Sequence, residues 1–206
     1  MFSGIVAATG RITHVTSAER GLRLSIDAGS LGLTDVTIGD SIAVCGVCLT
    51  VVAKQDNQFE VDVSRETLEC TTGLDTPAEV NLEKALQLSD RIGGHLVSGH
   101  VDGIGEVTGF TPVGESHELV VLAPHALARY IARKGSVTVD GVSLTINRVE
   151  DTSGGCEFSI NLIPHTLAAT TLKSLRVGAR VNLEIDLVAR YVERMLAATT
   201  VEGRCA

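Results

Sequence analysis

The chain has 206 residues and a formal net charge of −8, with 44% hydrophobic and 20% charged side chains. This is the composition of globular domains, and the acidic balance argues against nucleic acid or anionic membrane as a partner, because both need clustered Lys and Arg. The sequence contains no apolar run of about 18 residues, and its N-terminal stretch lacks the basic and apolar regions of a signal peptide. We therefore expect a cytoplasmic protein without a membrane span.

Cysteine usage points to free thiols rather than to disulfides or a metal site. The chain has five cysteines, an odd number at irregular spacing, which fits a reducing compartment. Cys45 and Cys48 are three positions apart, but there is no second such pair to complete four zinc ligands. The residues around them favour an extended strand, in which these two side chains would point to opposite faces. We expect no bound metal.

Taken in chain order, the first half alternates short apolar segments with Gly, Asp and Ser, a pattern that predicts β-strands joined by turns. The expected strands lie within residues 22–26, 41–52, 58–63 and 79–83. A short helical turn is expected after Ser64. Paired glycines at positions 93 and 94 indicate a flexible turn at which the two halves join.

The second half repeats this pattern and ends in a helix. Helical turns are expected at Pro124, because Pro is favoured at the start of a helix, and after Ile163. In the last segment, apolar side chains recur at helical spacing; they are Leu187, Val188, Tyr191, Val192, Met195 and Leu196. This helix either packs back on its own domain or meets copies of itself along an apolar seam. The sequence leaves both options open.

The chain is an internal duplication. The segment SIAVCGVCLTV begins at Ser41 and returns as SVTVDGVSLTI from Ser136. Three further motifs occur in the same order in both halves: SG-x-V from Ser3 and Ser98, TL-x-x-TT from Thr67 and Thr166, and VNLE from Val80 and Val181. Four ordered matches exclude coincidence. Each half is the size of a small domain.

Many short strands and few helices predict a small barrel or sandwich in each half. Because the halves match, we expect the same fold in both. The expected domains are residues 1–95, residues 96–186 and a helical tail of residues 187–206 that serves oligomerisation.

Several motifs together carry a family resemblance over nearly the whole chain: MFSGIV, GVCLTV, GGHLVSGHVDG, DGVSLTI, NLIPHTLAATTL and VNLEID. The sequence resembles the riboflavin synthase family of the two-repeat type. The resemblance implies an all-β fold, with two homologous six-stranded Greek-key barrels in tandem plus a C-terminal α-helix, assembled as a homotrimer. It implies a transferase that converts two molecules of 6,7-dimethyl-8-ribityllumazine into riboflavin and 5-amino-6-(D-ribitylamino)uracil without a cofactor. Lumazine synthase is a candidate partner.

The implied reaction gives the duplication a chemical reason. A dismutation needs two copies of one heterocycle, one as donor and one as acceptor of a four-carbon unit. Related barrels that face each other across neighbouring subunits would hold both copies, and replacing an encounter in solution in this way is worth about 7 to 11 kcal/mol. Donor and acceptor must react differently, and the two copies differ at matched positions: Cys48 against Ser143, Ile5 against His100, and Glu66 against His165.

The resemblance also implies site residues. The expected catalytic residues are Cys48 and His100, as proton carriers or nucleophile, with Ser143 and Thr145 as hydrogen-bond partners. Substrate-binding positions carried over to the first barrel are Gly4, Ile5, Val6, Cys48, Leu49, Thr50, Asp62, Val63, Ser64, Arg65, Glu66 and Thr67. Those carried over to the second barrel are Gly99, His100, Val101, Lys134, Ser143, Leu144, Thr145, Asn161, Leu162, Ile163, Pro164, His165 and Thr166.

Each catalytic candidate also has a structural explanation. Cys48 on its own is a small buried hydrophobe, as most free cysteines are. Ser143 and Thr145 are compatible with strand residues that bond to nearby backbone. His100 carries an imidazole, a group suited to proton transfer, or it orients a loop beside His95.

Two positions depart from the family pattern. Ser3 stands where Thr is usual, which keeps the hydroxyl. Cys45 stands where Asn is common before Gly, which puts a polar contact there in doubt.

Two rival functions are open. One is a non-catalytic lumazine or flavin carrier of the same fold, but both halves retain the SG-x-V, GV-x-LT and TL-x-x-TT motifs, which favours the enzyme. The other is a flavin-dependent oxidoreductase. The chain has no nicotinamide domain, and Gly103-Ile104-Gly105 lacks the rest of a G-x-G-x-x-G fingerprint.

Overall fold

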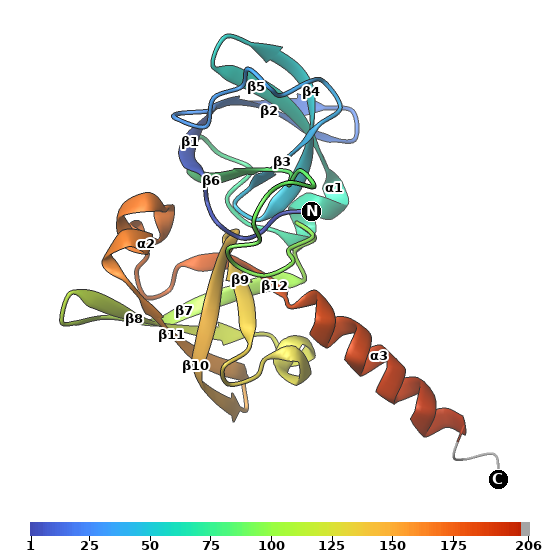
Figure 1. Ribbon diagram of the computed structural model, residues 1–206, viewed down its shortest axis with the longest axis vertical. Helices are drawn as coiled ribbons and strands as arrows, with labels where there is room; N and C mark the ends of the chain where they lie inside the picture. Colours follow the sequence, from blue (N-terminus) through green and yellow to red (C-terminus); the bar gives the residue numbers. More distant parts are fainter. Residues whose placement is uncertain (203–206) are drawn as a thin grey trace.

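The computed structural model describes the backbone of residues 1–202 and the side chains of residues 1–197. Two closed six-stranded barrels, one from each half of the chain, are stacked on one another and followed by a long helix (Figure 1). This confirms the expected all-β architecture of two tandem barrels with a C-terminal helix.

Both barrels have the same strand order. The first contains β1 (Ala8–Ala18), β2 (Gly21–Asp27), β3 (Ser41–Val44), β4 (Val47–Gln55), β5 (Gln58–Ser64) and β6 (Glu79–Lys84) in the order β1-β2-β5-β4-β3-β6. The second contains β7 (Gly103–Val113), β8 (Ser116–Ala123), β9 (Ser136–Val139), β10 (Val142–Thr152), β11 (Gly155–Leu162) and β12 (Arg180–Ile185). Its order around the closed sheet is β7-β8-β11-β10-β9-β12. Strands β3, β4 and β5 follow one another and β6 returns beside β3, which makes each barrel a Greek key.

Alternation along the strands decides which side chains fill the barrels. In β4, Val47, Leu49 and Val51 are buried, whereas Cys48 is half-buried and Thr50 is exposed. Strand β10 repeats this pattern from Val142 onward. The inward residues form a separate core in each barrel, and successive strand residues point to opposite faces. The outward face of β4 and of β10 is therefore free to carry chemistry.

The expectation of one extended strand around Cys45 and Cys48 is wrong. Residues 41–55 form a hairpin, because Val44 pairs with Val47 around a two-residue turn. Cys45 and Gly46 both have positive φ, 47° and 81°, as a type I′ hairpin turn requires. Cys45 therefore lies at the turn, and only Cys48 lies on the outward face.

The same turn recurs in the second barrel, and the two turns contact each other. Asp140 and Gly141 have φ of 47° and 81°. A Cβ on Gly46 would lie 2.8 Å from the amide nitrogen of Gly141, and a Cβ on Gly141 would lie 2.7 Å from that of Gly46. Glycine is thus required at both turns, because the two backbones approach too closely for any side chain.

Short helices follow equivalent strands in the two barrels. Helix α1 (Arg65–Cys70) follows β5, and the Ser64 hydroxyl accepts a hydrogen bond from the amide of Thr67, which caps the helix. Helix α2 (Pro164–Ala169) follows β11 and is continued by the 3-10 helix η2 (Thr171–Ser174). Pro124 immediately precedes η1 (His125–Tyr130), so the helical turn expected there is a 3-10 helix.

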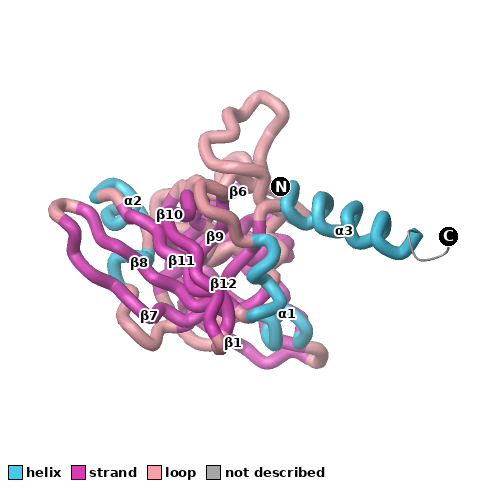
Figure 2. The backbone as a smooth tube through the Cα atoms, turned by 90° about the horizontal axis from the view of Figure 1, so that it is seen from below, coloured by secondary structure: helices cyan, strands magenta, loops and turns pink. Residues whose placement is uncertain are grey.

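Helix α3 (Leu187–Glu202) extends away from both barrels in the two perpendicular views (Figures 1 and 2). Its first turns are fixed to the second barrel by ion pairs from Arg190 to Asp102 and from Arg129 to Glu193. Val188, Tyr191 and Val192 on it are exposed. No helix among the described residues is long and apolar enough to cross a membrane. Cys205 lies outside the described residues.

Candidate functional sites

The SG-x-V motif of each repeat lies against the barrel of the other repeat. The carbonyl oxygen of Gly4 accepts a 2.7 Å hydrogen bond from the amide of Ser143, and the carbonyl oxygen of Gly99 accepts a 2.8 Å bond from the amide of Cys48. Val101 packs on the first core. The expected grouping is therefore wrong: residues 4–6 belong with Ser143 and residues 99–101 with Cys48.

Phe2 and Val97, which immediately precede these motifs, pair with each other at the junction of the two barrels. Each donates its amide to the carbonyl of the other, at 2.7 and 3.0 Å. Because Phe2 and Val97 occupy matching places in the two repeats, this bridge lies near the local two-fold axis that relates them. The residues that follow the bridge, 3–6 and 98–101, are called the crossing segments here, because each runs on to the barrel of the other repeat.

Buried glutamates from the VNLE motifs hold these crossing segments. Glu83 accepts hydrogen bonds from the amide and hydroxyl of Ser3 and from the amide of Gly4, at 2.7 to 3.0 Å. Glu184 makes the same three contacts with Ser98 and Gly99. Burial raises the pKa of both carboxyl groups, and the hydrogen bonds oppose this shift. Each carboxyl therefore serves as a fixed acceptor for a segment that lines the opposite pocket.

Asparagines of the same motifs join the barrels directly. The Asn81 side chain accepts from the amide of Thr171 and donates to the carbonyl of Asp140. Asn182 makes the same pair of bonds in the other direction across the junction: it accepts from the amide of Thr72 and donates to the carbonyl of Cys45. The TL-x-x-TT and turn motifs are thus tied to the opposite repeat. At position 45, where Asn is common in the family, the contact with Asn182 uses the main-chain carbonyl of Cys45.

The first candidate site is a pocket of about 320 Å³ at the outer face of the first barrel. Its lining comes from β4, from α1 and from the crossing segment: Val47, Cys48, Glu66, Thr67, Cys70, Thr71, Gly99, His100 and Val101. Both expected catalytic residues of proton-handling type, Cys48 and His100, thus line one cavity although they come from different repeats. Two thiols, an imidazole and a carboxylate share this pocket.

The second candidate site surrounds Ser143 on the outer face of the second barrel. The Ser143 hydroxyl lies 2.7 Å from Nδ1 of His95, which belongs to the connection between the repeats. On the other side of the ring, Nε2 lies 3.5 Å from the hydroxyl of Thr138. Burial lowers the pKa of His95, and the charge of Asp186 opposes that shift. A neutral imidazole therefore contacts Ser143 at neutral pH.

Several expected substrate-binding residues can contribute only their main chain. Leu49, Val63, Leu144 and Leu162 are buried in the barrel cores, so their side chains face away from the outer surface. Thr50 and Thr145 are exposed one residue beyond Leu49 and Leu144, next along the outward face from Cys48 and Ser143.

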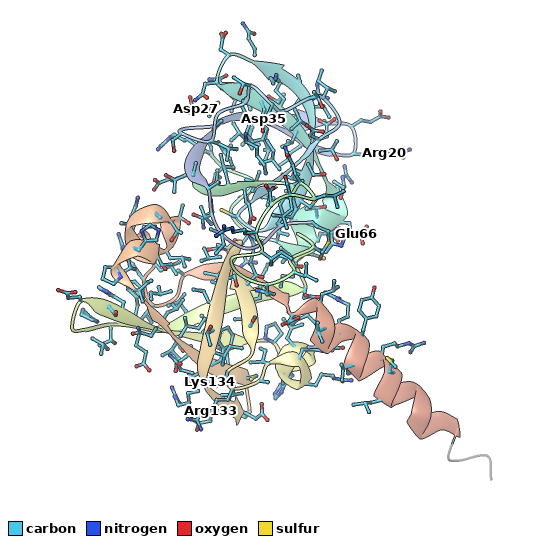
Figure 3. The ribbon with its side chains drawn as sticks, viewed as in Figure 1. Arg20, Asp27, Asp35, Glu66, Arg133 and Lys134 are labelled. Carbon is cyan, nitrogen blue, oxygen red and sulfur yellow. The ribbon has the colours of Figure 1, made fainter. Side chains whose placement is uncertain are left out.

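The segments that follow β5 and β11 are the other expected binding elements. The Asp62 carboxylate is held in two hydrogen bonds by Arg23, at 2.7 and 2.9 Å, which lowers the pKa of Asp62. Ser64 caps α1, and Arg65 is exposed. Glu66 lies on α1 beside the junction of the two barrels (Figure 3).

The matching segment of the second barrel, residues 161–166, contains no Asp, Glu, Lys or Arg. Asn161, Ile163, Pro164 and His165 are exposed, and Thr166 is half-buried. Ile163 exposes 52% of its surface, which is high for an apolar side chain. Ile5, on the crossing segment of this site, exposes 50%. These two side chains offer apolar surface for contact with a ring.

Lys134 marks a further difference between the two barrels. It lies at the far end of the second barrel (Figure 3), with φ of 67° and its ammonium 3.3 Å from the side-chain oxygen of Asn147. Asn147 follows Ser143 and Thr145 on the exposed side of β10. In the first barrel, Gly39 makes the equivalent backbone contact to Val51 that Lys134 makes to Ile146. Only the second of these two positions can supply a positive charge.

Sequence reasoning missed the residues that hold the sites together. These are Glu83, Glu184, Asn81, Asn182 and His95, together with Cys70 and Thr71 of the first pocket. A signal was present for four of them, because VNLE occurs in both halves with a polar and an acidic residue inside a strand. An acid buried in a strand needs hydrogen-bond donors.

Two related barrels with a candidate site on each define a two-repeat ligand-binding protein. The lumazine binding domain model matches residues 3–85 and 98–186, and the chain belongs to this family. The chain is 43% identical to riboflavin synthase of Photobacterium phosphoreum, an alignment that covers 99% of this chain and 93% of that protein. It is 45% identical to riboflavin synthase of Mycobacterium bovis, with 95% and 98% covered.

Solved structures share the fold. LumP complexed with riboflavin superimposes with a TM-score of 0.80 at 26% identity, covering 90% of this chain and 99% of that one. LumP complexed with 6,7-dimethyl-8-(1'-D-ribityl) lumazine gives 0.78 at 25% identity, covering 89% and 98%. The two-repeat architecture is thus found both in proteins named as synthases and in LumP.

Proposed function

We propose that the chain is a riboflavin synthase, which converts two molecules of 6,7-dimethyl-8-ribityllumazine into riboflavin and 5-amino-6-(D-ribitylamino)uracil by transfer of a four-carbon unit. The observation that carries the proposal is the identity of 43 to 45% to riboflavin synthases over nearly the whole chain. The two diverged sites support it, since donor and acceptor are one compound that must react in two ways.

The chemistry begins with loss of a proton from the 7-methyl group of one lumazine, whose carbanion is delocalised over the ring. A nucleophile adds to C7 of the other lumazine, the carbanion attacks that ring, and carbon–carbon bond formation closes the new ring. Eliminations then expel the added nucleophile and 5-amino-6-(D-ribitylamino)uracil, which leaves riboflavin. Water, a ribityl hydroxyl and a side chain are alternative nucleophiles. The chain contributes placement of the two rings and hydrogen bonds to the developing anion.

We assign roles by pocket. Cys48 and His100 line the first pocket and are proposed to handle protons or to act as nucleophile there. Ser143 and Thr145 are proposed to hydrogen-bond the ligand at the second site. The remaining carried-over residues, from Gly4 to Thr67 and from Gly99 to Thr166, are proposed to bind ligand through main chain or side chain as their burial allows.

We propose a homotrimer in which a first barrel of one subunit faces a second barrel of its neighbour. The exposed apolar side chains of Val188, Tyr191 and Val192 on α3 support this, because a helix away from the body of its chain gains by covering such a face. The interpretation as three domains, with residues 187–206 for oligomerisation, belongs to the same proposal. Lumazine synthase as a partner and a cytoplasmic location are further parts of it, and co-purification and fractionation test them.

The trimer is tested with Val192→Asp, which leaves the ion pairs of Arg190 and Glu193 in place. We expect monomers by analytical ultracentrifugation and at least a tenfold loss of riboflavin formation, since each composite site needs two subunits. Val113→Asp, the same change at an exposed valine in the hairpin between β7 and β8, serves as the control and should stay trimeric. An active monomer of the Val192 variant would contradict the assembly.

A carrier of the same fold is the second candidate function, favoured by the superposition on LumP. The structure removes one argument against it: the repeated motifs hold the barrels together, so a carrier would need them too. Purified protein mixed with the dimethyl lumazine alone separates the two. Riboflavin appears if the chain is a synthase, and tight binding without turnover identifies a carrier.

Variants of the first pocket test the assigned roles. Cys48→Ser and His100→Gln are each expected to slow turnover by about 10²- to 10⁴-fold, the usual worth of an acid–base group. Each should still bind lumazine, as measured by fluorescence titration, because the second site is untouched. Turnover at the wild-type rate in either variant removes that residue from the chemistry.

A further inference from the structure

The crossing segment that lines the first pocket is fixed on both sides of its pocket-lining residues. The carbonyl of Gly99 accepts the hydrogen bond from β4 described above. Directly after the segment, the amide of Asp102 donates to the carbonyl of Leu183 at 2.8 Å. Only residues 100 and 101 lie between these two fixed points, and both line the first pocket. Their position therefore depends on how firmly each point is held.

The carboxylate of Asp102 joins the second of these points to α3. It accepts a 2.9 Å hydrogen bond from the amide of Ile185, the last residue of β12. Nη2 of Arg190, in the first turn of α3, lies 2.8 Å from Oδ1 and 2.9 Å from Oδ2. The two side chains expose 11% and 38% of their surface, against 27% and 62% for Glu193 and Arg129, which also hold α3. Ion pairs weaken with exposure to solvent, so the pair at Asp102 is the firmer of the two.

The imidazole of His100 depends on this backbone for its orientation. The residue is exposed, and its amide lies 3.3 Å from the hydroxyl of Ser98. Its ring has no hydrogen bond to any residue that the structure describes. Because the allowed rotamers of a side chain follow from its φ and ψ, a shift of the backbone at Asp102 moves the ring within the first pocket.

The first repeat lacks this anchor. Ala7 occupies the place of Asp102, because its amide makes the equivalent bond to the carbonyl of Leu82, at 2.9 Å. Alanine has no carboxylate, and within the described residues no helix lies between β6 and β7. The residue that matches His100 is Ile5, whose apolar surface needs no defined orientation to contact a ring. The anchor is thus present in the repeat whose crossing segment carries an acid–base side chain.

We propose that Asp102 and Arg190 are positioning residues of the first pocket, whose ion pair ties the crossing segment to α3 and so holds the imidazole of His100 toward the bound lumazine. This inference rests on the proposed function and deepens it. It also gives α3, the helix assigned to assembly, a direct link to a pocket of its own chain. Without the ion pair, the segment should cover Cys48 less firmly and His100 should lose its orientation.

Arg190→Met tests the ion pair by steady-state riboflavin formation, because it removes the charge and keeps most of the length of the side chain. We expect kcat to fall about tenfold with a smaller rise in KM, since a misplaced acid–base group acts mainly on the transition state. Arg190→Lys restores a positive charge and should recover most of kcat. Arg129→Met is the matched control, because it breaks the other ion pair of α3 and contacts no crossing segment. It should keep the wild-type rate.

The double variant Arg190→Met/His100→Gln shows whether the pair acts through the histidine. If it does, the double variant is no slower than His100→Gln alone, because both changes remove one function. Asp102→Asn keeps an oxygen for the amide of Ile185 and loses the charge, so it should reproduce Arg190→Met. Losses that multiply in the double variant, or an Asp102→Asn variant at the wild-type rate, overturn the inference.

A measurement without turnover separates this inference from the proposed function. The Gly99 backbone lies against the side chain of Cys48, so alkylation of that thiol by iodoacetamide, located by peptide mass spectrometry, reports how firmly the segment covers it. Arg190→Met should raise the alkylation rate about three- to tenfold, as local opening exposes the thiol, and Arg129→Met should not. An unchanged rate in Arg190→Met contradicts the positioning role. Wild-type protein that forms no riboflavin, with alkylation rates that differ as expected, contradicts only the proposed function.

Assembly and fold are checked for each variant by analytical ultracentrifugation and urea unfolding. The apolar side chains of α3 are unchanged in all of them, so each should assemble as wild type does. If Arg190→Met and Asp102→Asn both fail to assemble where wild type does, the ion pair acts on assembly rather than on the pocket, and the inference is overturned.

Discussion

The two pockets share the same backbone and glutamate contacts, called the frame here, and differ in the side chains that line them. In both, a strand amide bonds to the carbonyl of a glycine from the other repeat, and a buried glutamate holds that glycine. The outward residue is Cys48 in one and Ser143 in the other, where His95 is added. The difference shows that position and reactivity are set by separate residues. The frame can stay constant while the reactive groups diverge.

The largest effects are expected from breaking the frame at its glycines. Gly99 has φ of 79°, and a Cβ there would lie 2.6 Å from the Cβ of Cys48. Gly99→Ala combines left-handed strain with overpacking and should lower the free energy of unfolding by about 2 to 5 kcal/mol. Urea unfolding measures this, and riboflavin formation should fall with it. Gly4→Ala should do the same at Ser143, where the overlap is equal.

Gly32→Ala is the matched control, because Gly32 has φ of 64° but nothing lies within 4 Å of the position that its Cβ would take. It should show the backbone strain alone, about 1 to 2 kcal/mol. A Gly99 variant no less stable than the Gly32 variant would contradict the close approach of the crossing segment to β4.

Replacing Glu83 or Glu184, the buried glutamates that hold the crossing segments, tests whether each half of the chain affects the pocket of the other half. Glu184→Gln places an amide group against the donors of Ser98 and Gly99, and should cost about 1 to 3 kcal/mol, the penalty for a buried donor left without a partner. Because the Gly99 backbone lies against the side chain of Cys48, this loss should couple in a double-mutant cycle to Cys48→Ala by more than about 0.5 kcal/mol.

The same cycle between Glu184→Gln and Ser143→Ala should give a smaller coupling, since these two residues are related only through Thr138, their common cross-strand neighbour. Glu83→Gln should give the opposite result, with the larger coupling to Ser143→Ala and the smaller one to Cys48→Ala, to which it is related through Ala43. Equal coupling of both glutamates to both strands would rule out the crossed arrangement. Ligand titration and urea unfolding provide the energies.

A smaller effect is expected from the two hairpin turns that contact each other. Asp140 in the second turn occupies the position that Cys45 has in the first. Burial raises the pKa of Asp140 to about 7, above the usual value for an unfolded chain. The folded state therefore keeps a proton that the unfolded state has lost, and stability falls as pH rises from about 4 through 7. Asp140→Asn removes this loss and should stabilise the protein by about 1 to 2 kcal/mol at pH 8, while at pH 4 it should match wild type.

Cys45→Asn is the companion variant for this test. Burial raises the pKa of the Cys45 thiol, so the thiol stays neutral throughout and its replacement should leave the pH dependence of unfolding unchanged. Thermal unfolding from pH 4 to pH 8 makes the comparison. A pH-independent gain in the Asp140 variant would show that its carboxyl is not the titrating group.

The sequence predicted the repeats and the short strands because those depend on local patterns, namely alternation in the strands and the recurrence of four motifs. Those patterns left a barrel and a sandwich both open, and the barrel was implied by the family resemblance. The hairpin at Cys45 was missed although its signal was present in the other copy. Asp140-Gly141 is the dipeptide typical of a type I′ turn, and Cys45-Gly46 aligns with it. Cys is not typical of such a turn, so the turn at Cys45 could be recognised only by comparison with Asp140 in the second copy.

The crossing of the segments could not be predicted in the same way. The sequence of residues 3–6 does not show which barrel this segment lies against. Glu83 of its own repeat bonds to it on one side, and Ser143 of the other repeat bonds to it on the other side. For the same reason His95 was noted only as a neighbour of His100. Its contact with Ser143 arises from the path of a connection that has no regular structure.

The exchange of the segments that precede the barrels has a consequence for how such a chain evolves. Neither half is a self-sufficient unit, because a change in the opening residues of one is felt in the cavity of the other. The halves therefore cannot drift apart independently, even though they are separate stretches of gene. A single ancestral repeat would have had to pair with a twin to complete its cavity, and fusion made that pairing permanent while freeing each copy to specialise.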